Sequence, residues 1–149
     1  MCLVIDANQA GDFCKQEKPH LKCLLGWINS GGRVVSAGEL ERELFRVNAM
    51  RTLALEWSRR GNLIKLNAQE VTARKNQIAP MCRSNDAHVV AVTIVGRADV
   101  VVTSDKLLIQ DLKDTAIVGS RRKIYKENSA SPGRVDRHAK LLRSLDCPN

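Results

Sequence analysis

The sequence predicts an α/β domain with three layers, in which a central, mainly parallel sheet of about four to five strands lies between two layers of helices. Two observations carry this prediction. Short runs of aliphatic and β-branched residues alternate along the chain with amphipathic segments of helical period. The chain also has 149 residues, of which 44% are hydrophobic and 3% aromatic, so it can bury one aliphatic core.

The first part of the chain predicts two strands and two helices. Residues 2–5 form a short apolar run that stops at Asp6, and residues 33–36 form a second run. Between them, leucines recur at helical spacing over residues 20–29, and a Ser-Gly-Gly sequence ends that helix. A single long helix with one apolar stripe is expected over residues 38–60, because the next glycine follows directly.

The middle of the chain contains an ambiguous apolar segment. Residues 63–66 are a candidate strand, and residues 68–79 a candidate polar helix. The β-branched residues of the segment 86–95 favour a strand by propensity. However, Ser84-Asn85-Asp86 is a good helix N-cap cluster, and a strand here would need a tight hairpin before the valine run 100–103. The sequence therefore predicts a buried helix over 86–95, followed by a strand over 100–103.

The last part of the chain is basic. It predicts a helix over 106–112, strands over 116–118 and 124–125, a linker over 129–133 and an amphipathic helix over 135–145. The whole chain has a formal net charge of +8, and eight of its Lys and Arg residues, against three acids, lie beyond residue 120. We therefore divide the chain into a domain of residues 1–126 and a basic linker and helix of residues 127–149. Such a charge pattern is typical of a nucleic-acid partner, although a solvated tail explains it equally well.

Composition excludes several kinds of protein. No apolar run approaches the roughly 20 residues of a membrane helix, and the N-terminus lacks the pattern of a signal peptide, so we expect no membrane partner and a cytoplasmic location. The five cysteines form no CxxC pair, which indicates reduced thiols rather than disulfides or structural zinc. The three histidines are far apart in sequence, so a histidine-based metal site or a nucleophilic triad has little support.

Acidic residues stand where strands end or helices begin. Asp6 and Asp105 each follow an apolar run, and Asp86 begins the predicted buried helix. Each of them alone is explained by helix capping. In a parallel sheet, however, the carboxyl ends of the strands meet at one edge, where ligands bind. Together with a glutamate from residues 39–43, the three aspartates are therefore expected to crowd on one edge of the sheet.

Crowded carboxylates repel each other, so a cation is expected among them. Because the sequence places no histidine or cysteine with them, an all-oxygen site is predicted, which suits Mg²⁺ or Mn²⁺. In a basic protein, hard divalent ions held by carboxylates indicate the cleavage of a phosphodiester bond. No side-chain nucleophile is then required.

Three stretches resemble the PIN domain, the compact α/β fold of metal-dependent ribonucleases that includes toxin-type bacterial nucleases. They are VIDAN over residues 4–8, VVSAGELERELFRV over 34–47 and SNDAHVVAVTIVGRADVVVTSD over 84–105. The last stretch is the most specific. It contains, in this order, an Asp, a predicted buried helix, an Ala-Asp pair, a valine strand and a Thr-x-Asp sequence. The resemblance covers most of residues 1–120, and the tail beyond residue 121 is not well matched.

The resemblance implies a set of site residues. The acidic quartet of the family falls on Asp6, Glu43, Asp86 and Asp105, which would be catalytic, and the three aspartates would hold the metal. Glu39 lies one helical turn before Glu43 and is the alternative second acid. The family's polar support for these acids falls on two further residues, Asn8 and Thr103. Asp111 and Asp114 are expected on the solvated face of the next helix.

The resulting functional hypothesis is a Mg²⁺- or Mn²⁺-dependent endoribonuclease. The resemblance implies that the protein hydrolyses RNA and acts as the toxin of a toxin–antitoxin pair, with an antitoxin or inhibitor protein and a second copy of the chain as further partners. The basic tail, together with Arg59, Arg60, Arg74 and Lys75, would contact the RNA backbone. The alternative hypothesis is a PIN-fold module that binds nucleic acid or acts as a scaffold without catalysis. Metal-dependent cleavage distinguishes the two.

Overall fold

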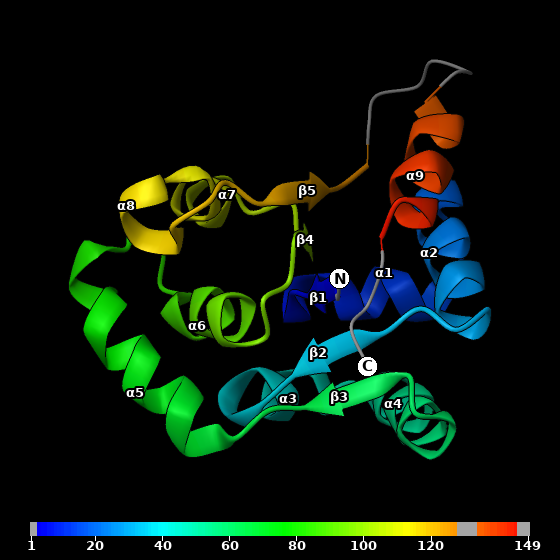
Figure 1. Ribbon diagram of the computed structural model, residues 1–149. Helices are drawn as coiled ribbons and strands as arrows, with labels where there is room; N and C mark the ends of the chain where they lie inside the picture. The colour runs from blue at the N-terminus through cyan, green and yellow to red at the C-terminus, as the bar shows by residue number, and fades with distance from the viewer. Residues whose placement is uncertain (1–2, 128–133, 146–149) are drawn as a thin grey trace.

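The computed structural model describes residues 3–127 and 134–145, and within them one five-stranded sheet forms the centre of the protein (Figure 1). All four strand pairings are parallel, and the strand order is β3-β2-β1-β4-β5. The strands are β1 (Leu3–Ile5), β2 (Val34–Ser36), β3 (Leu63–Lys65), β4 (Val100–Val102) and β5 (Lys123–Tyr125). The predicted α/β class with a parallel sheet is therefore confirmed.

The strand sequences match their places in the sheet. The three central strands β1, β2 and β4 are buried at every position, as expected for unbroken apolar runs that are covered on both faces. Residues of the edge strand β3 are partly or fully exposed, and Lys123 of β5 is exposed. Side chains from both faces of the central strands make up most of the core, with Trp57, Phe13 and Tyr125 as its largest buried rings.

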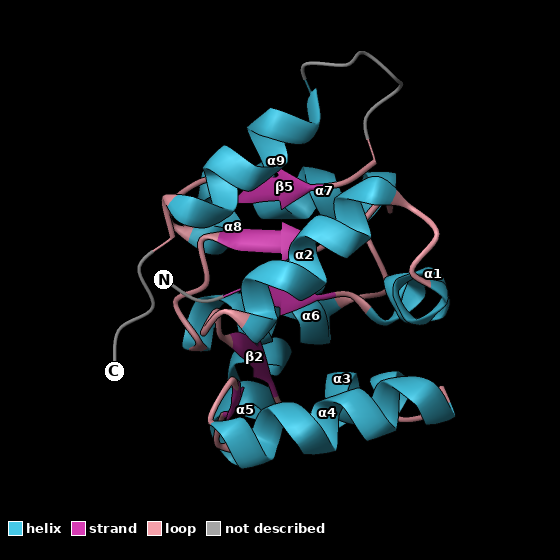
Figure 2. Ribbon diagram, turned by 90° about the vertical axis from the view of Figure 1, so that its right-hand side faces the viewer, coloured by secondary structure: helices cyan, strands magenta, loops and turns pink. Residues whose placement is uncertain are grey.

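Helices cover the sheet on both faces (Figures 1 and 2). The helices on one face are α1 (Ala10–Lys15), α2 (Pro19–Asn29), α4 (Asn48–Arg60) and α9 (Arg134–Arg143). Those on the other are α5 (Ala68–Ile78), α6 (Ala87–Val95), α7 (Lys106–Lys113) and α8 (Thr115–Val118). The helix α3 (Gly38–Leu44) follows β2 at the edge of the sheet, and the short 3₁₀ helices η1 (Ala7–Gln9) and η2 (Ala79–Met81) complete these elements. The three-layer arrangement predicted from the sequence is thus present.

Two predicted elements were wrong. The single helix expected over residues 38–60 is divided into α3 and α4, because Val47 adopts an extended backbone before α4 begins. The turn lets the apolar stripes of both helices reach the core, with Leu40 and Met50 buried on either side of it. The strand expected over residues 116–118 is the helix α8. The side chain of Asp114 accepts a hydrogen bond from the amide of Ala116 and so stabilises the start of that helix.

Helix α6 packs against β2 through Gly96, the residue that follows it. A Cβ atom at Gly96 would lie 2.7 Å from Cγ1 of Val35, so the backbone approaches the sheet more closely than any side chain allows. We expect Gly96→Ala to lower the free energy of unfolding by about 2 kcal/mol through overpacking. The matched control is Gly26→Ala in α2, where a Cβ would meet nothing within 4 Å.

Denaturant unfolding of the two variants tests this packing. Because alanine is the better helix former, Gly26→Ala should stabilise the protein by about 0.5–1 kcal/mol. Equal stability of Gly96→Ala and the wild type would contradict the close approach of α6 to β2.

The basic C-terminal region contributes to the folded body. Helix α9, expected over 135–145, packs along α2, and its residues Leu142 and His138 are buried. Tyr125 of β5 donates a short hydrogen bond to the carbonyl of His20 and lies against the ring of His138. The linker expected over residues 129–133 lies outside the described residues. None of the helices in residues 3–127 and 134–145 is long and apolar enough to cross a membrane.

Candidate metal-binding active site

The three aspartates predicted from the sequence reach the carboxyl edge of the sheet. Asp6 follows β1 and Asp105 follows β4, and these strands are neighbours whose last residues, Ile5 and Val102, are register partners. Asp86 immediately precedes α6, which packs over β1 and β2. Residues nearly 100 positions apart in the chain are therefore brought to one place by the sheet topology.

Thr103 connects two of these acids. Its hydroxyl donates a hydrogen bond of 2.8 Å to Oδ2 of Asp6 and accepts one of 3.1 Å from the amide of Asp105. Asp105 in turn caps α7, because its Oδ1 accepts the amide of Leu108 at 3.0 Å. The threonine is fully buried, so it fixes the carboxylate of Asp6 relative to the start of α7.

Burial and neighbouring negative charge raise the pKa values of Asp6 and Asp86. Burial raises the pKa of Asp6, whose side chain is 2% exposed, and the charges of Asp86 and Asp105 raise it further. Burial also raises the pKa of Asp86, and Asp105 adds to that effect. Among the described residues, no Lys or Arg forms an ion pair with any of the three. Their negative charge is thus offset only in part, by the Thr103 hydroxyl at Asp6 and by His88 near Asp86, and a bound cation would relieve the remaining cost.

This cost predicts that the effect of Asp6→Asn on the free energy of unfolding depends on pH. Because the pKa of Asp6 is higher in the folded than in the unfolded state, its ionised form destabilises the fold at all pH values above the folded pKa. Without divalent ions, Asp6→Asn should therefore raise the free energy of unfolding at neutral pH by about 1 kcal/mol. The gain should vanish as the pH falls below the unfolded pKa, where both states are protonated. Thermal unfolding in EDTA between neutral and acid pH measures this, and a variant less stable than wild type at neutral pH would contradict it.

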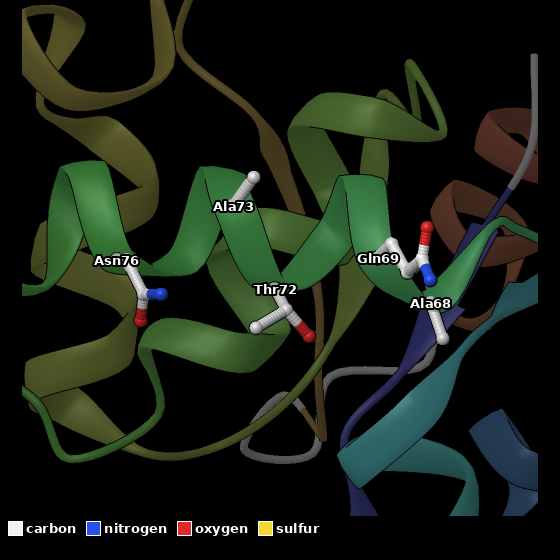
Figure 3. Close-up of a pocket in the computed structure, with 5 residues that line it drawn as sticks. All are labelled: Ala68, Gln69, Thr72, Ala73 and Asn76. Atoms are coloured by element: carbon white, nitrogen blue, oxygen red, sulfur yellow. The ribbon is translucent and has the colours of Figure 1, made fainter.

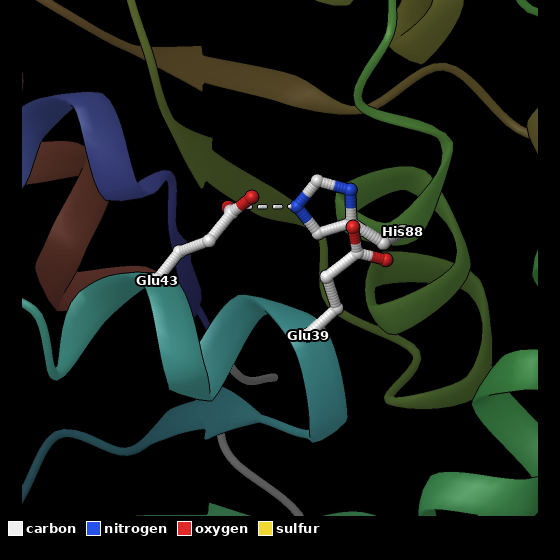
Figure 4. A group of neighbouring side chains, drawn as sticks. All are labelled: Glu39, Glu43 and His88. Carbon is white, nitrogen blue, oxygen red and sulfur yellow. Dashed lines mark hydrogen bonds and ion pairs between the residues drawn. The ribbon is translucent and has the colours of Figure 1, made fainter.

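A second group of ligand-type side chains lies beside the aspartates (Figure 4). Glu39 and Glu43 project from α3, and His88 projects from α6 between their carboxylates. One ligand atom from each of the three lies within 4.8 Å of the others, so the group can hold a metal ion. Glu43, preferred as the fourth acid, and Glu39, its alternative, both belong to this group.

The prediction that no histidine lies at this edge of the sheet is wrong. His88 is 4% exposed, and its Nε2 lies 2.9 Å from Oε2 of Glu43. Its positive or dipolar character also acts on Asp86, whose pKa it lowers against the effect of burial. Position 88 is far in sequence from residues 39 and 43, so no local spacing revealed the pair. A histidine two residues after a site aspartate was the one available signal.

Lys75 of α5 is the basic residue that reaches the second group. Its Nζ lies 2.7 Å from Oε2 of Glu39, and this ion pair holds the pKa of Glu39 below its usual value. Arg59 and Arg60, also expected to contact RNA, end α4 just before β3 begins and so lie at the opposite edge of the sheet. Arg60 pairs there with Glu56. Lys75, one of the four basic residues expected to contact RNA, thus forms an ion pair with this group.

Asp111 is buried, although the sequence predicted a solvated position. Its side chain is fully buried in the last turn of α7 and accepts hydrogen bonds from the amides of Arg83 and Ser84, at 2.8 and 3.0 Å, and from the Ser84 hydroxyl at 2.7 Å. The Ser84 hydroxyl accepts the amide of Asp86 at 3.3 Å. Asp111 therefore fixes the loop that leads to Asp86. Asp114 is partly exposed and pairs with Arg83 at 3.1 Å.

Other polar residues near the edge differ from the expectation. Asn8 contacts Asp6 through its backbone amide at 3.5 Å, and its side chain is exposed. The side chain of the neighbouring Gln9 is buried instead, and its Nε2 donates a hydrogen bond to the hydroxyl of Ser104 at 3.0 Å. Ser36, at the end of β2, is 2% exposed, and its hydroxyl has no hydrogen-bond partner among the described residues. Neither Gln9 nor Ser36 carries a sequence signal that separates it from an ordinary polar residue.

A hollow on the surface is lined by other residues. It has a volume of about 400 Å³ and follows one face of α5, where Ala68, Gln69, Thr72, Ala73 and Asn76 line it (Figure 3). None of its lining residues is acidic or a histidine, so the hollow itself offers no carboxylate or imidazole ligand.

Known proteins add no further assignment to this geometry. Comparison of the chain with protein-family models, with curated proteins and with solved structures gives no match in any of the three. The assignment of a function therefore rests on the arrangement of Asp6, Asp86, Asp105 and the neighbouring Glu39, Glu43 and His88.

Proposed function

We propose that this protein is a metal-dependent endoribonuclease that hydrolyses RNA phosphodiester bonds. The observation that carries the proposal is the convergence of Asp6, Asp86 and Asp105, from three separate segments, with no Lys or Arg of residues 3–127 and 134–145 in an ion pair with them. Placing three carboxylates together is costly, and burial increases the cost for Asp6 and Asp86. Proteins commonly accept such strain at functional sites. The PIN-domain resemblance of the same residues supports this reading.

We expect a Mg²⁺ or Mn²⁺ ion to draw the three aspartates together, because among the described residues the group whose ligand atoms already lie within 4.8 Å of one another is Glu39, Glu43 and His88. All three aspartates offer oxygen atoms, which these hard cations prefer, and Asp6 has its orientation fixed by Thr103. When bound, such an ion would supply Lewis acidity toward a phosphodiester and toward the water that attacks it. The negative charge of the three side chains would hold the ion. Because the hydroxyl of Thr103 is buried and already bonded, its role is to orient Asp6.

RNA is the proposed substrate because the chain is basic and offers a polar, water-accessible edge. Asp105 and Glu43 are half-buried, so they are accessible from solvent next to the buried Asp6. Lys106 is exposed directly after Asp105, and Lys75 lies over Glu39, so two cations flank the carboxylates. Contacts of this kind bind the phosphate backbone and carry little base specificity.

The test is cleavage of end-labelled single-stranded RNA by the full chain with Mg²⁺, with Mn²⁺ or with EDTA. We expect internal cleavage with either ion and none with EDTA. A DNA strand of the same sequence in parallel reactions shows whether the enzyme selects RNA. Cleavage that persists in EDTA would refute a metal-dependent mechanism. Binding of the RNA without cleavage under all conditions would instead identify a non-catalytic nucleic-acid-binding module.

A further inference from the structure

Glu39, Glu43 and His88 differ chemically from the three aspartates beside them. The aspartates offer only oxygen atoms, whereas this group adds an imidazole nitrogen. Its members come from two facing helices, α3 and α6, and share no side chain with the aspartate group. A metal ion at this group would therefore be held by a separate set of ligands, with different selectivity.

The geometry of the group suits a bound cation. Two ligand atoms that share an ion at bond lengths of about 2.1 Å lie roughly 3 Å apart in an octahedral arrangement. The distance between Nε2 of His88 and Oε2 of Glu43 is 2.9 Å, so both atoms can bind one ion once the carboxylate of Glu43 turns off the axis of the imidazole nitrogen. The third ligand, Glu39, is held nearby, within the 4.8 Å limit of the group.

The imidazole of His88 is an independent indication of a ligand. The residue is 4% exposed and lies between the two carboxylates, with Nε2 directed at Glu43. A buried imidazole nitrogen aimed at a carboxylate, with a second carboxylate nearby, is the donor arrangement that a transition-metal ion uses.

Lys75 gives the group a cation in the metal-free protein. Its ammonium group lies 2.7 Å from Glu39, and both side chains are partly exposed, so the ion pair can open toward solvent. A second ion pair of α3 is a natural comparison, because Lys65 of β3 lies 3.2 Å from Glu41, which is not part of the group.

We propose that Glu39, Glu43 and His88 form a second cation site, which takes a divalent transition-metal ion such as Mn²⁺ in preference to Mg²⁺, and that this ion displaces Lys75 from Glu39. The preference follows from the nitrogen ligand, since imidazole suits transition ions and Mg²⁺ favours oxygen and water. The inference concerns metal binding by these residues and does not rest on RNA cleavage.

The test is a titration of the full chain with Mn²⁺ in a large excess of Mg²⁺, followed by the electron paramagnetic resonance signal of free Mn²⁺. The excess Mg²⁺ fills the all-oxygen aspartate site, so the remaining Mn²⁺ binding reports the second site. We expect the wild type to bind one Mn²⁺ per chain under these conditions. Glu39→Gln, on a partly exposed helix surface, and His88→Ala should each weaken this binding by about 100-fold, whereas Glu41→Gln should leave it unchanged.

Replacement of Lys75 provides a second test, in which the affinity for Mn²⁺ should rise rather than fall. Lys75→Met should tighten Mn²⁺ binding up to about fivefold, since the energy of an exposed ion pair no longer opposes the metal. Lys65→Met, which removes the same charge from the same region, should not change it.

Three results would overturn the proposal: loss of all Mn²⁺ binding in excess Mg²⁺, undiminished binding by Glu39→Gln, or equal effects of the two lysine variants. Asp105→Asn separates this inference from the proposed function. If the second site is real, Asp105→Asn still binds one Mn²⁺ in excess Mg²⁺, whether or not any form of the protein cleaves RNA.

Discussion

Asp105→Asn should reduce metal-dependent RNA cleavage by at least about 100-fold, an effect typical of losing one charged or hydrogen-bonding group from an active site. The substitution keeps the size of the side chain and the oxygen that accepts the amide of Leu108, so α7 should still be capped. What it removes is one negative charge from the group that also contains Asp6 and Asp86. The weaker charge should lower the affinity for the metal and loosen the position of the ion relative to the scissile phosphodiester.

Asp114→Asn is the matched control for this experiment. Asp114 also caps a helix with its side chain, α8, and the substitution removes the same charge. It lies at the far end of α7 from Asp105, so cleavage should be unchanged. Initial rates at saturating Mg²⁺, with circular dichroism to check folding, give the comparison. If Asp105→Asn cuts RNA as fast as the wild type, Asp105 is a helix cap and the aspartate group is not the catalytic centre.

Asp111→Ala should lower the free energy of unfolding by about 3 kcal/mol or more. The carboxylate is fully buried and accepts two backbone amides and one hydroxyl from the loop before α6, and its removal leaves those donors without acceptors. Losing one partner of a buried, charge-assisted network costs more than the net strength of its bonds. Urea unfolding followed by circular dichroism measures the loss.

A neighbouring aspartate again gives the control. Asp114→Ala removes an exposed cap and an ion pair with Arg83, and should cost about 1 kcal/mol. If the two variants are equally stable, the bonds of Asp111 do not hold the 83–84 loop. Because that loop leads directly to Asp86, folded Asp111→Asn protein should also bind the catalytic metal more weakly than the wild type.

Much of the fold could be predicted because the strands are distinctive. Short aliphatic runs mark β1, β2 and β4, and a polar residue comes at the end of each run, as Asp6, Ser36 and Thr103. The helix α6 was predicted from its N-cap cluster against its strand propensity, and the structure confirms that reading. The strand expected over 116–118 failed because three apolar residues cannot distinguish a strand from one turn of helix. The helix is favoured here because the side chain of Asp114 caps its first turn.

The site could be predicted in part, for a related reason. Asp6 and Asp105 follow strands, so their meeting follows from the parallel sheet alone. The pairing of His88 with Glu43 depends instead on how α3 and α6 pack, which no residue spacing encodes. Asp111 was misplaced because helical periodicity treats a charged residue as exposed. Its burial is explained by two amides in a distant loop that need an acceptor.

The parallel pairing of β1 with β4 also makes the domain depend on contacts that are distant in sequence. Leu3 pairs with Val100, so β1 gains this neighbour only after nearly 100 further residues have been synthesised. Contacts so distant in sequence form late and slow the folding of a domain. Asp6 and Asp105 therefore come together only in the folded sheet, and a partly synthesised chain that lacks β4 cannot hold the pair.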